Sequence, residues 1–252
     1  MDLCEGTLCS GQRHPWELVR RNLFRRVLAL AGLPPRPLRL LDLGAGDGWL
    51  ARELFPALNP ESAVWCCDAN YTDTMLDELA ATAPPRFRYC RETPSGEFDV
   101  ILMLDVLEHI ADDAGFLAET VARRLAGSGI LLCSVPAHSW LFSAHDRQLG
   151  HYRRYAPRQA RCLLRGAGLK PMLEGGLFPS LLPIRAMRLT LESAGWLHHP
   201  PATAAGWHHG PAITGMVTTA LNTDAAICLA ASRISLSLPG LSWWACCRKN
   251  PA

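Results

Sequence analysis

A strand-like apolar run that ends in a glycine-rich turn constrains the fold of this chain more than any other part of its sequence. Residues 38–43 are apolar enough for a buried strand, and Gly44-Ala45-Gly46-Asp47-Gly48 separates them from a helix predicted over 49–55. Glycine lets the backbone turn sharply and approach a ligand closely, because no Cβ intervenes. The first turn of the helix then offers unpaired N–H groups to polar atoms of that ligand. The pattern therefore predicts an α/β fold with a nucleotide site at this turn.

The rest of the chain alternates between short apolar runs and amphipathic stretches, which is typical of βαβ units with a parallel sheet. Further strands are predicted at 63–67, 87–90, 99–104, 130–135, 169–175 and 242–247. Further helices are predicted at 72–81, 112–125, 157–167, 178–194 and 212–232. Residues 127–129 are predicted as the turn before the fifth strand. Residues 136–155 are predicted as a long polar and aromatic loop, and loops of that length are commonly functional or disordered.

The spacing of the glycines narrows the kind of nucleotide. Dinucleotide folds carry G-x-G-x-x-G, whereas here the third glycine comes one residue early and gives G-x-G-x-G. Asp42 lies just upstream of the turn. Asp68 ends the second predicted strand, at about the distance where a ribose-binding acid is expected, because a carboxylate can accept hydrogen bonds from both ribose hydroxyls. These features disfavour a nicotinamide-dependent oxidoreductase.

The segment after the fourth strand carries a resemblance to a known family. Together with the turn, Phe98-Asp99-Val100-Ile101-Leu102-Met103-Leu104-Asp105-Val106-Leu107-Glu108-His109-Ile110 resembles class I S-adenosylmethionine-dependent methyltransferases, in particular the superfamily of the quinone-biosynthesis methyltransferases. The resemblance covers roughly residues 38–135 and implies S-adenosyl-L-methionine as cofactor. It implies an α/β, Rossmann-like, seven-stranded and mostly parallel sheet with helices on both faces and an antiparallel last strand. An N-terminal helix and a helical insertion near the C-terminus are expected in addition.

The resemblance also implies a set of cofactor-binding residues. The turn residues Gly44, Ala45, Gly46 and Gly48 would line the methionine end of the cofactor, and Asp42 would hold the turn or the amino group. Asp68 would bind the ribose, Ala69 would lie against adenine and Glu92 would bind the adenine edge. Leu104 and Asp105 would flank the sulfonium.

The acceptor side is predicted in the loop 136–155. Three histidines could act as the base that takes a proton from a hydroxyl, thiol or acidic carbon, because imidazole titrates near neutral pH; they are His109, His145 and His151. The predicted acceptor-binding residues are Trp16, Asp146, Tyr152, Arg153, Arg154 and Tyr155. Asp146 could orient His145, and the two arginines could hold a carboxylate or phosphate. The alternative is that the loop residues form a hydrogen-bonded latch that packs the loop on the sheet, and that Trp16 is a core anchor.

Composition limits the partners and the compartment. The formal net charge is +2, so no general attraction to nucleic acid is expected. The ten cysteines have no zinc-ligand spacing, and the adjacent pairs Cys66–Cys67 and Cys246–Cys247 are predicted as small core residues of strands. The paired histidines His198-His199 and His208-His209 are predicted to be solvated, and no metal site is expected. No signal-peptide core and no unbroken apolar run of bilayer length is found, so a cytoplasmic location is expected.

The C-terminal third is unusually apolar, so part of it could form a hydrophobic acceptor pocket or contact a membrane peripherally. The whole chain, 1–252, is predicted as a single methyltransferase domain: 1–35 as a helical lid, 36–135 as the cofactor-binding core, and 136–252 as acceptor loop, helical cap and final strand. The predicted function is methylation of a small or lipid-like acceptor, on oxygen or carbon, in a biosynthetic pathway. A non-catalytic, cofactor-binding partner subunit is the main alternative, and the oligomeric state is left open.

Overall fold

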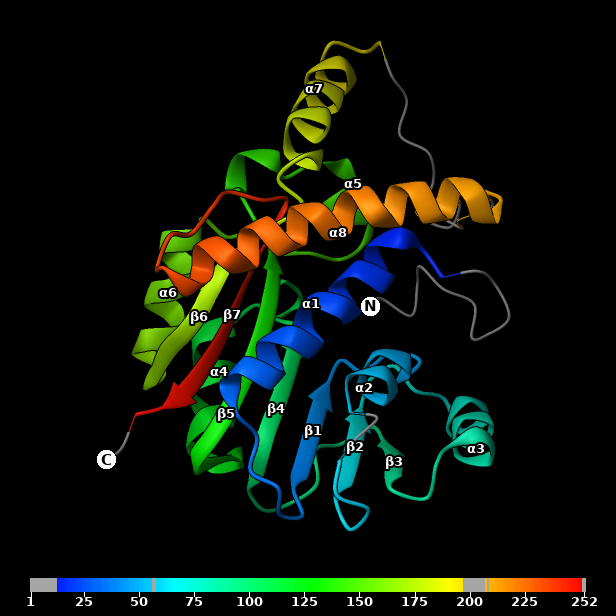
Figure 1. The fold of residues 1–252 in the computed structure, drawn as a ribbon, viewed down its shortest axis with the longest axis vertical. Helices are drawn as coiled ribbons and strands as arrows, with labels where there is room; N and C mark the ends of the chain where they lie inside the picture. Colours follow the sequence, from blue (N-terminus) through cyan, green and yellow to red (C-terminus); the bar gives the residue numbers. More distant parts are fainter. Residues whose placement is uncertain (1–12, 56–57, 197–206, 208, 251–252) are drawn as a thin grey trace.

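The computed structural model describes residues 13–55, 58–196, 207 and 209–250. Its centre is a seven-stranded sheet of order β3-β2-β1-β4-β5-β7-β6 (Figure 1). The strands are β1 (Arg39–Leu43), β2 (Ala63–Cys67), β3 (Phe87–Cys90), β4 (Phe98–Leu104), β5 (Leu125–Pro136), β6 (Leu169–Leu177) and β7 (Ser242–Lys249). Strand β7 is antiparallel to both of its neighbours, β5 and β6, and the other pairs are parallel. The predicted fold class is confirmed.

Helices cover both faces of the sheet. They are α1 (Pro15–Ala31), α2 (Trp49–Leu54), α3 (Asp73–Thr82), α4 (Asp113–Arg124), α5 (Ala144–Gln148), α6 (Pro157–Gly166), α7 (Leu181–Ser193) and α8 (Pro211–Arg233), with short 3₁₀ turns η1 (Leu107–His109) and η2 (Ser139–Leu141). Side chains of α1, α2 and α8 pack in one apolar cluster, and those of α4 and α6 pack in a second cluster on the opposite face.

Alternation along the strands explains the two clusters, because successive side chains of a strand point to opposite faces. In β4, Leu102 belongs to the α1 side and Met103 to the α4 side. The adjacent cysteines divide in the same way: Cys246 lies on the α1 side and Cys247 on the α4 side. Each of the eight cysteines in the described residues is a free thiol.

Helix α1 begins at a well-formed cap and continues across the sheet. The ring of His14 accepts a hydrogen bond from the backbone of Trp16, the side chain of Glu17 accepts one from His14, and Pro15 occupies the first turn, where its missing N–H costs nothing. The helix ends at Gly32, whose φ is 71°. Figure 1 shows α1 and α8 side by side across the same face of the sheet. The first turn of α1 lies over the carboxyl end of the parallel strands.

The C-terminal helices differ in their packing. Helix α8 buries Leu221, Ala225, Cys228 and Leu229, whereas α7 has no buried residue and projects beyond the edge at which the parallel strands end (Figure 1). By length and composition alone α8 could cross a membrane, and 28% of its most apolar 18-residue segment is buried. Core helices of soluble proteins can have the same length and composition.

The structure differs from the prediction in residues 127–129 and in the loop 136–155. Residues 127–129, predicted as a turn, belong to β5, whose pairing with β4 shifts register there by a bulge. The predicted loop 136–155 contains η2 and the short helix α5, because Ser143 and Asp146 form a capping box that starts a helical turn. His198, His199 and His208 lie outside the described residues.

Candidate active site

The glycine turn is held in a conformation that favours glycine at three positions. Gly44, Gly46 and Gly48 have φ values of 67°, 56° and 67°. A Cβ on Gly44 would lie 2.7 Å from Cγ2 of Val106, and one on Gly48 would lie 2.6 Å from Cε1 of Tyr89. The backbone therefore passes closer to its neighbours than a side chain would allow.

The end of β2 fixes this turn. The backbone N–H groups of Gly44 and Ala45 donate to the carbonyl of Cys67 at 2.8 and 3.2 Å. Gly46 donates to Asp68 Oδ2 at 3.1 Å, Asn70 donates to Asp68 Oδ1 at 2.9 Å, and the hydroxyl of Tyr71 donates to the carbonyl of Gly46 at 2.6 Å. The Asp68 carboxylate is thus 8% exposed and oriented by two backbone donors at the place predicted for the ribose acid.

A pocket opens between this turn and the first turn of α1. Its walls come from α1, β1, the glycine turn, α2 and β4, and they are formed by Trp16, Glu17, Arg20, Asp42, Gly44, Ala45, Asp47, Trp49, Leu50 and Leu104. Four of the predicted cofactor residues line it: Asp42, Gly44, Ala45 and Leu104. Burial raises the pKa of Asp42 to about 7, and the nearby carboxylates of Asp68 and Asp47 raise it as well.

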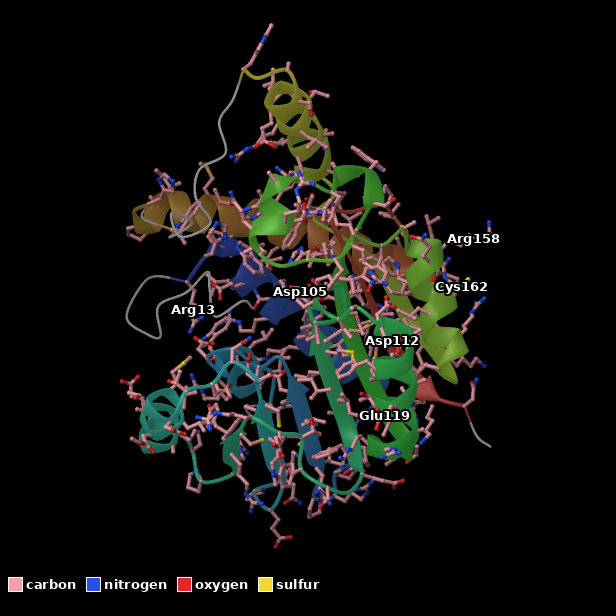
Figure 2. All side chains as sticks on the ribbon, turned by 180° about the vertical axis from the view of Figure 1, so that it is seen from behind. Arg13, Asp105, Asp112, Glu119, Arg158 and Cys162 are labelled. Carbon is pink, nitrogen blue, oxygen red and sulfur yellow. The ribbon has the colours of Figure 1, made fainter. Side chains whose placement is uncertain are left out.

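One wall of the pocket is closed by an ion-pair network that the sequence analysis missed. The Arg20 guanidinium lies 2.5 Å from Asp105 Oδ2 and donates to Ser134 Oγ at 2.9 Å, and Ser134 in turn donates to Asp105 Oδ1 at 2.9 Å. Burial opposes ionisation of Asp105, but Arg20 and Ser134 hold its pKa below the usual value. Asp105 itself has a φ of 58°, immediately after β4. Figure 2 shows Asp105 and, on the α1 side of the same region, Arg13, which pairs with Asp47 and Glu17.

Arg20 could have been found from the helical pattern of 15–31. It lies on the same stripe as Val19, Leu23 and Val27, which are fully or almost fully buried. A charged residue within such a stripe must have a buried partner, because burying an unpaired charge is costly. The sequence could not show that Asp105 is the partner of Arg20, because the two residues are 85 positions apart.

Two of the predicted cofactor residues, Ala69 and Glu92, do not line the pocket. Ala69 and Glu92 are both exposed, at the turns that follow β2 and β3. The carbonyl of Glu92 lies 3.9 Å from the Cys67 thiol. Their contacts with adenine stay predictions.

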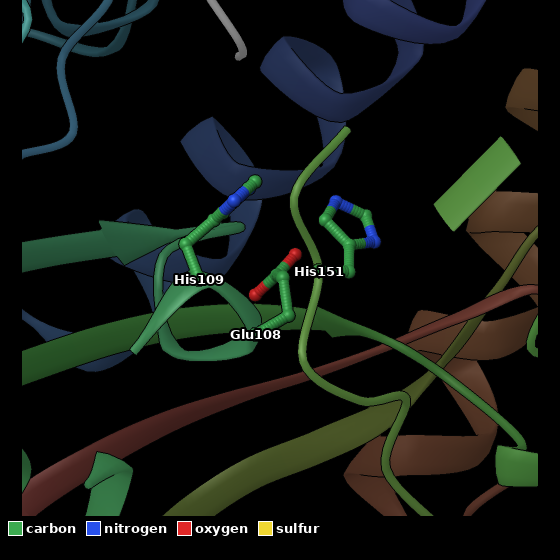
Figure 3. A group of neighbouring side chains, drawn as sticks. All are labelled: Glu108, His109 and His151. Carbon is green, nitrogen blue, oxygen red and sulfur yellow. The ribbon is translucent and has the colours of Figure 1, made fainter. Parts of the chain in front are cut away.

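The three predicted catalytic histidines are only partly brought together. His109 in η1 and His151 in the loop after α5 lie edge to face, with 4.6 Å between ring centroids. Beside them is the fully buried Glu108 (Figure 3). His145 is half-buried on α5, and burial lowers its pKa. The catalytic role of each histidine stays a prediction.

The loop after β5 is organised around Asp146, which is 0% exposed. Its Oδ2 accepts hydrogen bonds from the backbone and the hydroxyl of Ser143 at 2.9 and 3.0 Å. Its Oδ1 lies 3.2 Å from His151 Nδ1 and accepts a hydrogen bond from Arg154 Nε at 2.6 Å. Although burial opposes ionisation, the contacts with His151 and Arg154 hold the pKa of Asp146 well below its usual range. Asp146 therefore orients His151, whereas the sequence suggested His145.

The other predicted acceptor-binding residues make internal contacts or face solvent. Arg153 pairs with Asp113 at 3.1 Å, and the Tyr155 hydroxyl donates to the same carboxylate at 2.6 Å. Tyr152 is 60% exposed. Trp16 stands at the pocket wall with Arg20 stacked 5.1 Å from its ring. These internal contacts match the alternative of a hydrogen-bonded latch, and contact of these residues with an acceptor stays a prediction.

Comparison with known proteins decides the family. A family model described as a methyltransferase domain matches residues 16–178, which include the pocket and six of the seven strands. The chain belongs to this methyltransferase family. The predicted membership among S-adenosylmethionine-dependent methyltransferases, with S-adenosyl-L-methionine as cofactor, is confirmed.

Relatives of this methyltransferase have different acceptors in their names. It is 32% identical over 115 residues to the ubiquinone biosynthesis O-methyltransferase of Bartonella quintana, a match that covers 43% of the chain and 45% of the relative. It is 32% identical over 112 residues to the ribosomal protein L11 methyltransferase of Syntrophotalea carbinolica, covering 40% and 33%. The chain spans less than half the length of these two relatives.

Solved structures share the fold. An S-adenosylmethionine-dependent methyltransferase from Mesorhizobium loti has a TM-score of 0.53 at 15% identity, covering 89% of this chain and 96% of that one. Phosphoethanolamine N-methyltransferase 2 of Haemonchus contortus, solved with S-adenosyl-L-methionine, has a TM-score of 0.55 at 18% identity, covering 92% and 53%. At these identities the likeness shows the fold of the methyltransferase and leaves its acceptor open.

Proposed function

We propose that this chain is an S-adenosylmethionine-dependent methyltransferase that methylates an oxygen or carbon atom of a small or lipophilic acceptor. The observation that carries the proposal is the pocket between α1 and the glycine turn. It combines a close backbone approach at Gly44 with the carboxylate of Asp42, which suits the amino group of the cofactor. Asp68, which accepts a hydrogen bond from the glycine turn, would bind the ribose. Residues 1–35 would act as its lid and 136–252 as its acceptor-binding part.

The ion-pair network at the end of β4 supports the placement of the sulfonium. Leu104 lines the pocket and Asp105 follows it, so a methyl group carried between them would face the loop after β5. Methyl transfer from a sulfonium needs mainly alignment and a desolvated nucleophile, because the leaving group is already part of the donor. The polar groups of that face come from this loop and from η1, where the rings of His151 and His109 lie 4.6 Å apart.

The apolar surface near the carboxyl end of the sheet supports a lipophilic acceptor. On α7 the side chains of Ile184 and Met187 are 57% and 59% exposed, and on α8 Met216 is 68% exposed. Contiguous exposed apolar surface often marks a site that binds a ligand or a membrane. We infer a cytoplasmic protein whose α7 contacts the apolar part of the acceptor, or the membrane that holds it.

Binding and turnover test the two halves of this proposal separately. Calorimetry should show S-adenosylhomocysteine binding to the wild-type chain and at least tenfold weaker binding to Asp68→Ala, whereas Asp99→Ala, away from the pocket, should bind normally. Absence of binding by folded protein would contradict the cofactor assignment.

Turnover should be followed by mass spectrometry with methyl-deuterated S-adenosylmethionine and a panel of phenols, long-chain hydroxy compounds, amines and peptides. Label on an oxygen or carbon of a small or lipophilic compound is expected. Label on amines or peptides alone contradicts the proposed acceptor class, and cofactor binding without any turnover favours the non-catalytic partner subunit.

A further inference from the structure

The side chain of Glu108 is a buried carboxylate without a hydrogen-bond partner among the described residues. It is 1% exposed. Buried polar groups in proteins are nearly always hydrogen-bonded, and a buried unpaired charge is strongly disfavoured. Glu108 therefore needs either a proton or a cation.

Two imidazole groups surround this carboxylate. One donor atom from each of Glu108, His109 and His151 lies within 4.8 Å of the others. Figure 3 shows the Glu108 carboxylate between the two rings, with one ring nitrogen of His151 turned towards His109 and the other turned away. In a tetrahedral zinc site, bonds of about 2.1 Å place ligand atoms about 3.4 Å apart, so the three donors need only shift inwards by about 1 Å.

The loop holds His151 in the orientation that a metal ligand needs. His151 Nδ1 faces Asp146 Oδ1 at 3.2 Å, and because an ionised carboxylate only accepts hydrogen bonds, Nδ1 carries the proton. The other ring nitrogen, Nε2, is then the atom available to bind a metal ion. Asp146 is itself fixed by Arg154 and Ser143. A carboxylate that orients a histidine through its other nitrogen is the usual outer shell of a metal-bound imidazole.

We propose that Glu108, His109 and His151 bind one divalent transition-metal ion of the zinc type. Two imidazoles and one carboxylate are borderline ligands that suit Zn²⁺ better than Mg²⁺. Three protein ligands leave one position open, as in catalytic rather than structural zinc sites. The sequence could not indicate this site, since His151 follows Glu108 by 43 residues and each histidine alone looks ordinary.

The position of the proposed ion suggests which ligand occupies its open coordination position. This inference rests on the proposed methyltransferase function. Glu108 and His109 in η1 follow closely after Asp105, the residue predicted to flank the sulfonium, so the ion would lie on the sulfonium side of the site. An acceptor hydroxyl on the ion would lose its proton to water more readily. Its oxygen would form a bond to the methyl carbon while the carbon–sulfur bond breaks and that electron pair returns to sulfur. The products are a methyl ether and S-adenosylhomocysteine.

The first experiment measures metal binding alone, on the full chain stripped with a chelator. Equilibrium dialysis against Zn²⁺ should find one tight site, and Co²⁺ should give the visible absorption of a four-coordinate ion. Glu108→Gln and His151→Ala should weaken Zn²⁺ binding at least tenfold, which is the usual lower limit for loss of a ligand or its support. Circular dichroism and S-adenosylhomocysteine binding show that each variant is folded.

Other histidines supply the control, because His198, His199, His208 and His209 could bind Zn²⁺ adventitiously. A variant with all four replaced by alanine should keep the tight site. Loss of the site in that variant, or unchanged binding by Glu108→Gln, would overturn the proposal. Removing the metal should also abolish methyl transfer without changing S-adenosylhomocysteine affinity. If Zn²⁺ binds as expected but S-adenosylhomocysteine does not, the metal site stands and the proposed function fails.

Discussion

At the scale of single residues, the carboxyl group of Asp42 couples the proposed cofactor binding to pH. Burial raises its pKa to about 7, so in the free protein Asp42 is protonated below that pH and ionised above it. The ammonium group of the cofactor favours the ionised form. S-adenosylhomocysteine affinity should therefore fall about tenfold from pH 8 to pH 6, as expected for one linked proton. Calorimetry across this range measures it.

The matched variant for this prediction is Asp42→Asn, which removes the titrating group and keeps the shape of the side chain. It should bind more weakly at pH 8 and show a flat profile. A wild-type affinity that does not change between pH 6 and pH 8 would show that Asp42 does not contact the ammonium group.

A second residue-scale prediction concerns the glycine turn. Gly44→Ala combines a positive φ with a Cβ that would lie 2.7 Å from Val106, so unfolding free energy should fall by about 2–4 kcal/mol and cofactor binding should be lost. Gly168→Ala has a similar φ of 79° but no atom within 4 Å of its Cβ, so it should cost only about 1–2 kcal/mol and leave binding intact. Denaturant unfolding and calorimetry compare the two. Equal effects would mean that strain alone, and not close approach, determines the need for glycine.

At the scale of elements, Asp146 connects α5 to the loop that carries His151 and Arg154. Asp146→Asn leaves Arg154, which has 9% of its side chain exposed, without a charged partner. The unfolding free energy should fall by about 3–5 kcal/mol, as when one partner of a buried ion pair is removed. Chemical denaturation measures the change. Glu119→Gln, in the exposed pair with Arg123, is the control and should cost less than about 0.5 kcal/mol. A small effect of Asp146→Asn would show that the loop is not held by this latch.

The elements also show what sequence could and could not predict. The glycine turn and the position of Asp68 after β2 could be predicted from residues 38–68, because strand, turn and helix are contiguous there and each depends on local sequence. The alternation that placed Cys66 and Cys67 on opposite faces is equally local. Contacts between distant parts of the chain could not be predicted from the sequence. The pairs Arg20–Asp105 and Tyr155–Asp113, and the proximity of Glu108 to His151, depend on the order of strands and the path of the loop after β5. The contacts of the predicted acceptor side therefore became visible only in three dimensions.

At the scale of the whole molecule, the predicted donor side and the predicted acceptor side of the site lie at one edge of the sheet. Helix α1 closes this edge from one side, the loop after β5 lies on the other, and α7 rises above it (Figure 1). Arg185 joins α7 to the loop by donating to Ser143 Oγ at 2.6 Å. A long acceptor could thus have its reactive end between Asp105 and His151 and its apolar remainder along α7.

This arrangement predicts that substitutions on the exposed face of α7 weaken acceptor binding and leave the stability of the protein unchanged. Replacing Ile184 and Met187 together by aspartate should change the unfolding free energy by less than about 0.5 kcal/mol, because both side chains are more than half exposed. The KM for a long-chain acceptor should rise at least tenfold, whereas a short acceptor and S-adenosylhomocysteine should bind as in the wild type. Leu30→Asp, an exposed apolar residue at the far end of α1, is the control and should change neither KM. If the α7 variant handles long and short acceptors equally well, the projecting helix has no part in acceptor binding, and the lipophilic acceptor loses its main structural support.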